Sequence, residues 1–358
     1  MSIKTLGVYY EHPEWFEKFF KKLDDRGIYH IKMKSRNTSF DPGESKNKTG
    51  VDVMFNRMSP SAFNRGNENS IFYTINYLKY LESLGIEIIN GYDAYTYEFS
   101  KSNQINLLRS LNIKHPKTFV VNYENEILKT AKELKFPIVL KPNIGGSGAN
   151  IVKFETYNEL KNYLSLNKID WGIDKTLLVQ EFLKAKDSFI IRVETIGGKY
   201  LYAIKIHLTE GEFNLCPADY CKIDDQNIDG MKDGVSDRGA MVEKFDPPEN
   251  IIQNVEKIFQ TANIDVGGLE YLVNSEDGET YIYDINAMSN FVADPDIVLG
   301  FDPTDNLVDY IAQKLEVWYC NLYSYKCFSF TVNFFSSSSL GVGKFVIGSN
   351  KYGDLNSL

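Results

Sequence analysis

The chain has 358 residues, of which 43% are hydrophobic and 24% charged, and its formal net charge is −9 at pH 7. This composition supplies enough apolar surface for more than one hydrophobic core and argues against a disordered chain. The acidic balance disfavours a general nucleic-acid binder, and no run of 18 apolar residues predicts a membrane span.

The first hundred residues alternate predicted strands and helices. We expect strands at 4–9, 29–32, 51–55 and 86–89, helices at 13–23 and 71–84, and a loop at 37–50. This rhythm implies a small parallel sheet, which would bind ligands at the carboxyl ends of its strands. Arg57 and Arg65 follow the third strand at that edge and could hold a carboxylate or a phosphate. Two solvated loop arginines are the alternative.

The middle of the chain contains a strand that ends on a lysine and is followed by a glycine-rich turn. Residues 136–153 predict a strand to Lys141, a turn at 145–148 and a returning strand at 149–153. Glycines let the backbone approach a ligand closely, and successive N–H groups in such a turn can bind an anion. Together with the charge of Lys141, the turn favours a nucleoside triphosphate. An ordinary hairpin with a surface lysine is the alternative.

Further elements surround this strand. We expect a helix capped by Ser100 or Ser102, helices at 124–135, 156–166 and 247–263, and strands at 177–183, 266–273 and 280–287. Residues 188–196 and 199–208 predict a hairpin because a Gly-Gly turn joins two β-rich runs. The polar segment 224–246 predicts a loop.

Acidic and amide side chains fall on the two strands that follow residue 263. Asp284 and Asn286 are two residues apart and therefore share one strand face. If the strands pair about Asp277-Gly278, Glu270 lies near both. Buried carboxylates are costly unless they are neutralised, and Mg²⁺ favours one or two carboxylates with phosphate oxygens and water. A polar strand face exposed to water is the alternative.

With these pieces, the chain resembles the ATP-grasp superfamily, nearest the RimK-like and glutathione-synthetase-like carboxylate–amine ligases. The resemblance covers roughly residues 1–315 and rests on six motifs that appear in the family's order. They are Lys101, the strand ending on Lys141, Gly145–Gly148, Val179-Gln-Glu-Phe-Leu183, Ile190-Ile-Arg192, and Glu270 with Asp284-Ile-Asn286.

The resemblance implies the site residues. The nucleotide-binding residues would be Lys101, Lys141, Gly145, Gly146, Ser147, Gly148, Gln180, Glu181, Phe182, Leu183 and Lys205. Among these, Glu181 would accept a hydrogen bond from the adenine amino group. Arg192 and Lys141 would be the catalytic residues, and Glu270, Asp284 and Asn286 the metal ligands. Arg57, Arg65, Asn214 and Asn290 would lie on the substrate side.

Three departures from the family pattern stand out. The acidic pair has the order Glu270 then Asp284, where the usual order is Asp then Glu. The common Asp-x-Arg is Ile190-Ile-Arg192 here, and Ala287 replaces the usual glycine after the metal-binding asparagine. The charge of the predicted metal site is unchanged, whereas the entry of the substrate could differ.

The implied fold class is α/β (α+β) with the ATP-grasp architecture. We expect an N-terminal domain at 1–97, a lid subdomain at 98–183, a C-terminal subdomain with the Mg²⁺ site at 184–317, and an unassigned extension at 318–358. The resemblance implies an ATP-dependent ligase that joins a carboxylate to an amine through an acyl phosphate, on an amino acid or a peptide. Alternatives are an ATP-grasp kinase of a small polyol or phosphorylated metabolite, and a non-catalytic nucleotide-binding protein.

The expected cofactors are ATP and Mg²⁺, with Mn²⁺ as a second candidate ion. The expected partners are a small carboxylate, an amine and, as an option, a peptide or a second copy of the chain, but neither nucleic acid nor membrane. Four cysteines in two distant pairs do not form a disulfide framework, and the N-terminus predicts a strand instead of a signal peptide. We therefore expect a cytoplasmic location. A metal site at Cys216 and Cys221 is the less favoured interpretation of that pair.

Overall fold

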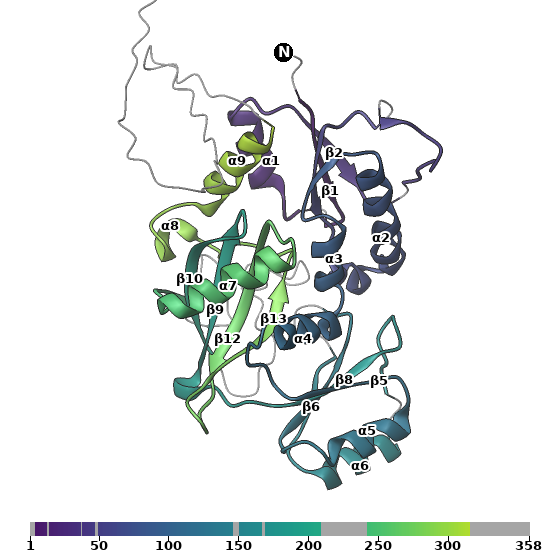
Figure 1. Ribbon diagram of the computed structural model, residues 1–358, viewed down its shortest axis with the longest axis vertical. Helices are drawn as coiled ribbons and strands as arrows, with labels where there is room; N and C mark the ends of the chain where they lie inside the picture. Colours follow the sequence, from purple (N-terminus) through teal and green to yellow (C-terminus); the bar gives the residue numbers. More distant parts are fainter. Residues whose placement is uncertain are drawn as a thin grey trace, which may run out of the picture. The chain divides into compact units, whose positions relative to one another are not determined.

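The computed structural model describes residues 4–12, 14–36, 38–46, 49–145, 150–166, 169–208 and 242–315. The described residues form three sheets with helices packed on them (Figure 1). Within these ranges, no helix combines the length and the apolar character that crossing a membrane requires. Several predictions fall outside the described residues, namely those on Gly146, Ser147, Gly148, Asn214, Cys216, Cys221 and 318–358.

The first sheet is parallel, as the alternation of strands and helices predicts. Its strand order is β2-β1-β3-β4, with β1 (Leu6–Tyr10), β2 (His30–Lys34), β3 (Val53–Arg57) and β4 (Glu87–Ile89). Helices α1 (Glu17–Asp25) and α2 (Glu68–Ser83) link these strands. The carboxyl ends of β1 and β3 lie side by side, because Tyr10 pairs with Arg57. This register places Arg57 at the ligand-binding edge of the sheet.

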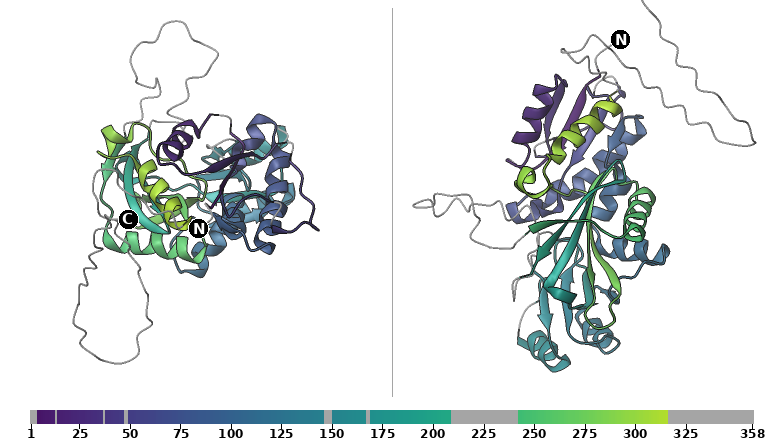
Figure 2. Two further views of the ribbon diagram at one scale, coloured as in Figure 1. Left: turned by 90° about the horizontal axis from the view of Figure 1, so that it is seen from above. Right: turned by 90° about the vertical axis from the view of Figure 1, so that its left-hand side faces the viewer.

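A helix from the end of the described chain completes the core of this first sheet. Helix α9 (Pro303–Lys314) packs beside α1 (Figure 2), and its Val308 and Ile311 join the apolar cluster of β1 and α1. Asp302 caps α9 by accepting a hydrogen bond from the Thr304 N–H at 2.9 Å. Lys22 of α1 lies 3.1 Å from the Asp302 carboxylate. The sequence interpretation predicted neither α9 nor the short helix α8 (Pro295–Val298).

The second sheet lies within residues 98–183, the predicted lid subdomain, and we call it the lid sheet. Its antiparallel strand order is β5-β8-β6-β7, with β5 (Thr118–Val121), β6 (Ile138–Pro142), β7 (Val152–Phe154) and β8 (Leu177–Glu181). Helices α5 (Glu124–Ala131) and α6 (Tyr157–Leu166) cover one face and share a core with the strands (Figure 1). The predicted helix 124–135 ends four residues early.

Two helices lead into the lid. Helix α3 (Tyr92–Glu98) was not predicted, and it is followed by α4 (Lys101–Ser110). Ser100 caps α4, because its hydroxyl accepts a hydrogen bond from the Asn103 N–H at 3.3 Å. Of the two predicted caps, Ser100 is therefore confirmed.

The third sheet has the strand order β11-β10-β9-β12-β13 and carries α7 (Glu249–Thr261) on one face (Figure 1). Strands β9 (Phe189–Ile196) and β10 (Lys199–His207) form the predicted Gly-Gly hairpin, and β12 (Val266–Val273) pairs with β13 (Thr280–Asn286). The prediction of a loop over 224–246 is wrong at its end. Val242–Phe245 forms β11, which pairs with the edge of β10, and backbone pairing there overrides the polar composition.

Candidate nucleotide and metal site

The carboxylate cluster lies at the pairing of β12 with β13. Glu270 stands directly opposite Asp284, and Gly268 opposite Asn286. The Asn286 amide donates a hydrogen bond to Asp284 at 3.1 Å. This register confirms that the three predicted metal-site side chains come together. The alternative of a solvated strand face is wrong for Glu270, which is only 5% exposed.

Two lysines from outside the third sheet face these carboxylates. Lys101, at the start of α4, forms an ion pair with Asp284. Lys141 lies at the end of β6 and is 6% exposed. Burial and the neighbouring charge of Lys101 lower the pKa of the Lys141 amine to about 7, although Asp284 and Glu270 oppose that shift. A buried lysine of this kind gains from an anionic ligand, because the ligand would compensate for its lost hydration.

The donor set fits a hard divalent cation. Burial, with a contribution from the charge of Asp284, raises the pKa of the Glu270 carboxyl to about 7. A cation between Glu270 and Asp284 would remove this penalty. In the described part of the chain, no three His, Cys, Asp or Glu side chains gather as a complete protein cage. Two carboxylates and one amide suit Mg²⁺, which keeps several positions for phosphate oxygens and water.

Arg192 joins the same cluster from β9. It lies opposite Glu270 on the neighbouring strand, and its Nη1 donates to Glu270 Oε1 at 3.1 Å. Its Nε donates to Glu194 at 2.6 Å, and its Nη2 donates to the Ser289 hydroxyl at 2.5 Å. The guanidinium group is therefore held in one orientation next to the predicted metal ligands, which suits the catalytic position predicted for it.

Sequence reasoning missed several members of this cluster. They are Glu98, Glu194, Tyr283 and Ser289. Glu194 follows Arg192 by two residues on a buried strand, so strand periodicity was the available signal. Burial raises the pKa of the Glu98 carboxyl to about 7, and the N–H of Met288 donates to this carboxyl at 3.0 Å.

The predicted nucleotide-binding residues Gln180, Glu181 and Phe182 lie at the end of β8 or directly after it. The Gln180 amide donates to the Thr118 hydroxyl at 2.7 Å and is buried within the lid. The Glu181 carboxylate accepts from the Lys135 N–H at 2.9 Å, and the Phe182 N–H donates to the Pro137 carbonyl at 2.9 Å. The backbone N–H of Phe182 therefore already has a hydrogen-bond partner within the protein.

Leu183, Gly145 and Lys205, also predicted to bind the nucleotide, lie in different parts of the structure. Leu183 packs with Ala185 in an apolar cluster of the third sheet. Gly145 lies three residues after the end of β6 and is the described end of the glycine turn. Lys205 belongs to β10, where its amine lies 3.1 Å from the Glu243 carboxylate and within reach of the Phe189 and Phe245 rings.

The two predicted substrate arginines differ in their partners. Arg57 is buried, and its Nη2 donates to the Ser289 carbonyl at 2.9 Å and to Asn290 Oδ1 at 2.7 Å. Burial lowers the pKa of Arg57 to about 10. Arg65 instead donates from Nε to Glu11 at 2.9 Å, at the end of a short 3₁₀ helix (Pro60–Arg65). The alternative of solvated arginines is therefore wrong for Arg57, whose partner Asn290 is a predicted substrate residue.

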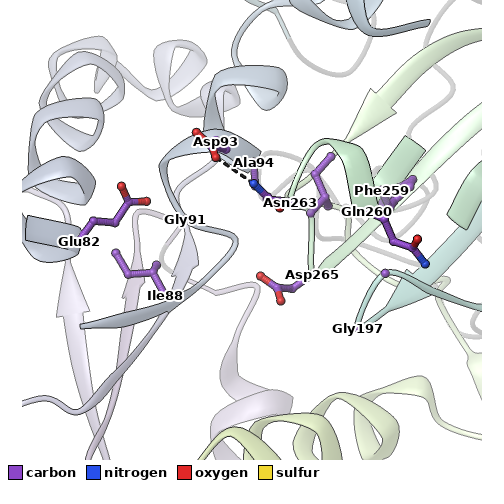
Figure 3. Close-up of a pocket in the computed structure, with 12 residues that line it drawn as sticks. Glu82, Ile88, Gly91, Asp93, Ala94, Gly197, Phe259, Gln260, Asn263 and Asp265 are labelled. Atoms are coloured by element: carbon purple, nitrogen blue, oxygen red, sulfur yellow. Dashed lines mark hydrogen bonds between the residues drawn. The ribbon is translucent and has the colours of Figure 1, made fainter. Parts of the chain in front are cut away.

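A separate pocket of about 360 Å³ lies away from this cluster (Figure 3). It is lined by α3, the β9–β10 turn and the end of α7, and contains none of the predicted site residues. Asn263 donates to the Asp93 carboxylate at 2.9 Å across it (Figure 3), and Asp265 accepts from the Tyr310 hydroxyl at 2.6 Å. The charged groups in this pocket already have protein partners.

Part of the chain is similar in sequence to a known family and to known ligases. Residues 99–220 match the family described as RimK-like ATP-grasp domain. A "Probable alpha-L-glutamate ligase" of Trichodesmium erythraeum (strain IMS101) is 26% identical over 169 residues, which are 47% of this chain and 53% of that protein. The "Alpha-aminoadipate--LysW ligase LysX" of Sulfurisphaera tokodaii is 23% identical over 324 residues, which are 87% of this chain and 98% of the relative.

The described fold is similar to the fold of solved ATP-grasp ligases. The solved structure of the ATP-grasp ligase PsnB, complexed with a phosphomimetic variant of minimal precursor, Mg and ADP, has a TM-score of 0.61. It is 18% identical and covers 87% of this chain and 99% of its own. The chain spans about half the length of the alpha-L-glutamate ligases that it matches. Residues 99–220 thus match a RimK-like ATP-grasp domain in sequence, and the described fold is similar to the fold of solved ATP-grasp ligases.

Proposed function

We propose that the protein is an ATP- and Mg²⁺-dependent ligase that joins a carboxylate to an amine through an acyl phosphate. The observation that carries this proposal is the convergence of Lys101, Lys141 and Arg192 on the Glu270–Asp284 pair. Two lysine amines, one guanidinium group and two carboxylates from three parts of the fold meet there. This arrangement suits a polyphosphate with its metal, because phosphoryl transfer depends mainly on positioning and charge stabilisation.

The chain's own residues supply specific parts of this chemistry. Lys101 and Lys141 would bind phosphate oxygens, and Arg192 would stabilise the charge that develops on the transferred phosphoryl group, which the contacts of these residues with the carboxylate cluster support. Glu270, Asp284 and Asn286 would hold Mg²⁺. When bound, Mg²⁺ would offset the negative charge of the phosphate groups. No acid–base triad is needed, since the reactants are positioned and their charge is neutralised.

The substrate would bind next to Arg57 and Asn290. Arg57 belongs to the ligand-binding edge of the first sheet and reaches the segment that follows the metal ligands. An anionic acyl substrate is the natural ligand for a buried guanidinium. An amino acid or a peptide meets this requirement, and the names of LysX and PsnB refer to a protein and a precursor as partners of those ligases.

Other parts of the proposal concern the setting of the enzyme. A cytoplasmic location fits its need for ATP. The use of Mn²⁺, self-association and the domain boundaries at 97, 183 and 317 remain predictions. The kinase alternative is less favoured, because the named relatives are ligases.

The test is an assay of ADP release with Mg²⁺, ATP and a panel of amino acids and peptides, followed by mass spectrometry of the product. We expect release to depend on both an acid and an amine, with loss of one water from the joined pair. The Asp284→Asn/Asn286→Ala variant should abolish ADP formation while leaving the circular dichroism spectrum unchanged. Undiminished ADP release by this variant would overturn the site assignment.

A further inference from the structure

Arg192 has an acidic neighbour on its own strand that the proposed chemistry does not use. Arg192 and Glu194 are two residues apart on β9 and share one face, while Ile191 and Val193 face the apolar core that includes α7. Glu194 is 1% exposed and Arg192 is 4% exposed. Both charges are thus withdrawn from water beside the metal cluster.

The neighbouring strand leaves room for this acidic side chain. Gly268 of β12 pairs with Glu194, and a Cβ at Gly268 would lie 2.6 Å from the Glu194 carboxylate. A real Cβ cannot approach an oxygen so closely, so any larger residue would displace Glu194. The sheet is therefore shaped around this carboxylate.

A closed ring of hydrogen bonds fixes the guanidinium group. Arg192 Nε donates to Glu194 Oε1 at 2.6 Å, and Arg192 Nη2 donates to the Ser289 hydroxyl at 2.5 Å. The Ser289 hydroxyl in turn donates to Glu194 at 2.6 Å. Arg192 cannot rotate without breaking two of these contacts, because all three members are buried.

Stability alone is a weak explanation for this ring. Taking two charges out of water costs several kcal/mol per ion on the order-of-magnitude scale, and apolar replacements of buried ion pairs are often neutral or stabilising. Glu270, the other acidic partner of Arg192, also accepts from the Tyr283 hydroxyl at 3.0 Å and is a proposed metal ligand. The hydrogen bonds of Glu194 within the described chain go to Arg192 and Ser289.

We propose that Glu194 is a positioning residue that, together with Ser289, aims the Arg192 guanidinium at the transferred phosphoryl group. This inference rests on the proposed function of the site. Glu194 touches no reacting atom in this account and acts through Arg192. Ser289 also contacts a predicted substrate residue, because its carbonyl accepts a hydrogen bond from Arg57 at 2.9 Å. It thereby connects Arg192, next to the proposed phosphoryl position, with Arg57 on the proposed substrate side.

The first test measures how strongly the protein recognises a third phosphate group. Isothermal titration calorimetry would compare the affinities for Mg·ADP and for Mg·AMPPNP in wild type, Glu194→Gln, Arg192→Lys and the double variant. We expect Glu194→Gln to reduce the preference for AMPPNP by about tenfold, the effect of one charge-assisted contact, with the ADP affinity changed less than twofold. The double variant should resemble Arg192→Lys alone.

Two further variants separate geometry from charge and from folding. Glu194→Asp keeps the charge but shortens the reach, so a positioning role predicts a loss as large as that of Glu194→Gln. Ser289→Ala should give a smaller loss of the same kind, and it tests the ring if Glu194→Gln fails to fold. Glu256→Gln is the matched control, because Glu256 pairs with Lys199 on the same domain but outside the ring.

A ligand-free readout tests the geometry itself. In a ¹H–¹⁵N spectrum, the Nε–H signal assigned to Arg192 by its loss in Arg192→Lys should exchange slowly in the wild type and rapidly in Glu194→Gln. An unchanged signal together with an unchanged AMPPNP preference would overturn the inference, as would additive effects in the double variant.

These results separate the inference from the proposed function. If nucleotide binding responds to Glu194→Gln but no acid and amine are joined, the inference stands and the ligase proposal fails. If products form and Glu194→Gln behaves like the wild type, the inference fails alone. If the wild type binds neither nucleotide, both are overturned.

Discussion

The lid sheet and the third sheet contribute to the candidate site in different ways. The third sheet brings Arg192, Glu194 and Glu270 together with their charges already paired. The lid brings Lys141, whose electrostatic neighbours Lys101, Asp284 and Glu270 all belong to elements outside that sheet. The third sheet is therefore preorganised, whereas the lid carries a charge that gains most when an anion binds. The contrast predicts that the third sheet orients the bound groups and that the lid sheet contributes an attraction for the anion.

The largest expected effect comes from removing the lid charge. Lys141→Met should weaken Mg·AMPPNP binding by about a hundredfold, since a buried cation beside a polyphosphate is a strong partner. The same change should leave the melting temperature at pH 7 equal or higher, because the buried amine no longer needs to be accommodated. Calorimetry and thermal melts measure the two effects. Lys129→Met, at an exposed lid position, is the control and should change neither.

The pH dependence of stability is a second test of the burial of the Lys141 amine. The folded pKa of Lys141 is about 7, below its ordinary value of 10.5, so the unfolded chain binds the proton more tightly. The contribution of Lys141 to stability should therefore rise as the pH increases from about 7 to 10. The difference in melting temperature between Lys141→Met and wild type should shrink over this range. A constant difference would contradict the burial of a titrating amine.

Arg57, at the end of β3, and Arg65, in the short helix that follows, provide the next comparison. The expected effect on substrate binding is of intermediate size. Arg57→Lys should raise the KM for the acyl substrate about tenfold, because lysine cannot reproduce the paired contacts with Ser289 and Asn290. Arg65→Lys should change KM less than threefold, since Arg65 is held by Glu11. Steady-state kinetics with the substrate found by the ADP assay would measure both. Equal effects would remove the distinction between the two arginines.

The smallest expected effect is the loss of stability when the Asp302 carboxylate, which caps α9, is removed. Asp302→Ala should destabilise the protein by about 1 kcal/mol through loss of the α9 cap, with a smaller loss for Asp302→Asn, which can still cap. Hydrogen bonds from Thr304 and the nearby lysines lower the folded pKa of Asp302 to about 2. The stabilisation of the folded state by the Asp302 charge is therefore present above pH 4 and is lost as the pH falls towards 2. Urea denaturation of wild type and Asp302→Asn at pH 7 and pH 3 would show the difference narrowing.

Local patterns were sufficient to predict much of the fold and the centre of the site. The turn after Val273 and the alternation along both strands were enough to bring Glu270 near Asp284. The exact pairing of these two residues also depends on a register shift between Glu270 and Tyr271, which no local pattern reports. The strand ending on Lys141 and the Gly-Gly hairpin were predictable from local patterns.

Long-range packing accounts for what the sequence could not predict. Ser289 meets Glu194 across 95 positions of sequence, and Arg57 meets Ser289 across 232, so no local pattern reports either contact. Helix α9 has an ordinary amphipathic pattern, which does not say that its partner is α1 near the opposite end of the described chain.

The most direct test of the central claim is titration of the wild type with AMPPNP in the presence and absence of Mg²⁺. We expect Mg²⁺-dependent binding of one nucleotide per chain in the wild type, and loss of that Mg²⁺ dependence in Asp284→Asn/Asn286→Ala. Absence of binding by the folded wild type, or equal Mg²⁺ dependence in the variant, would contradict the assignment of this cluster as a nucleotide and metal site.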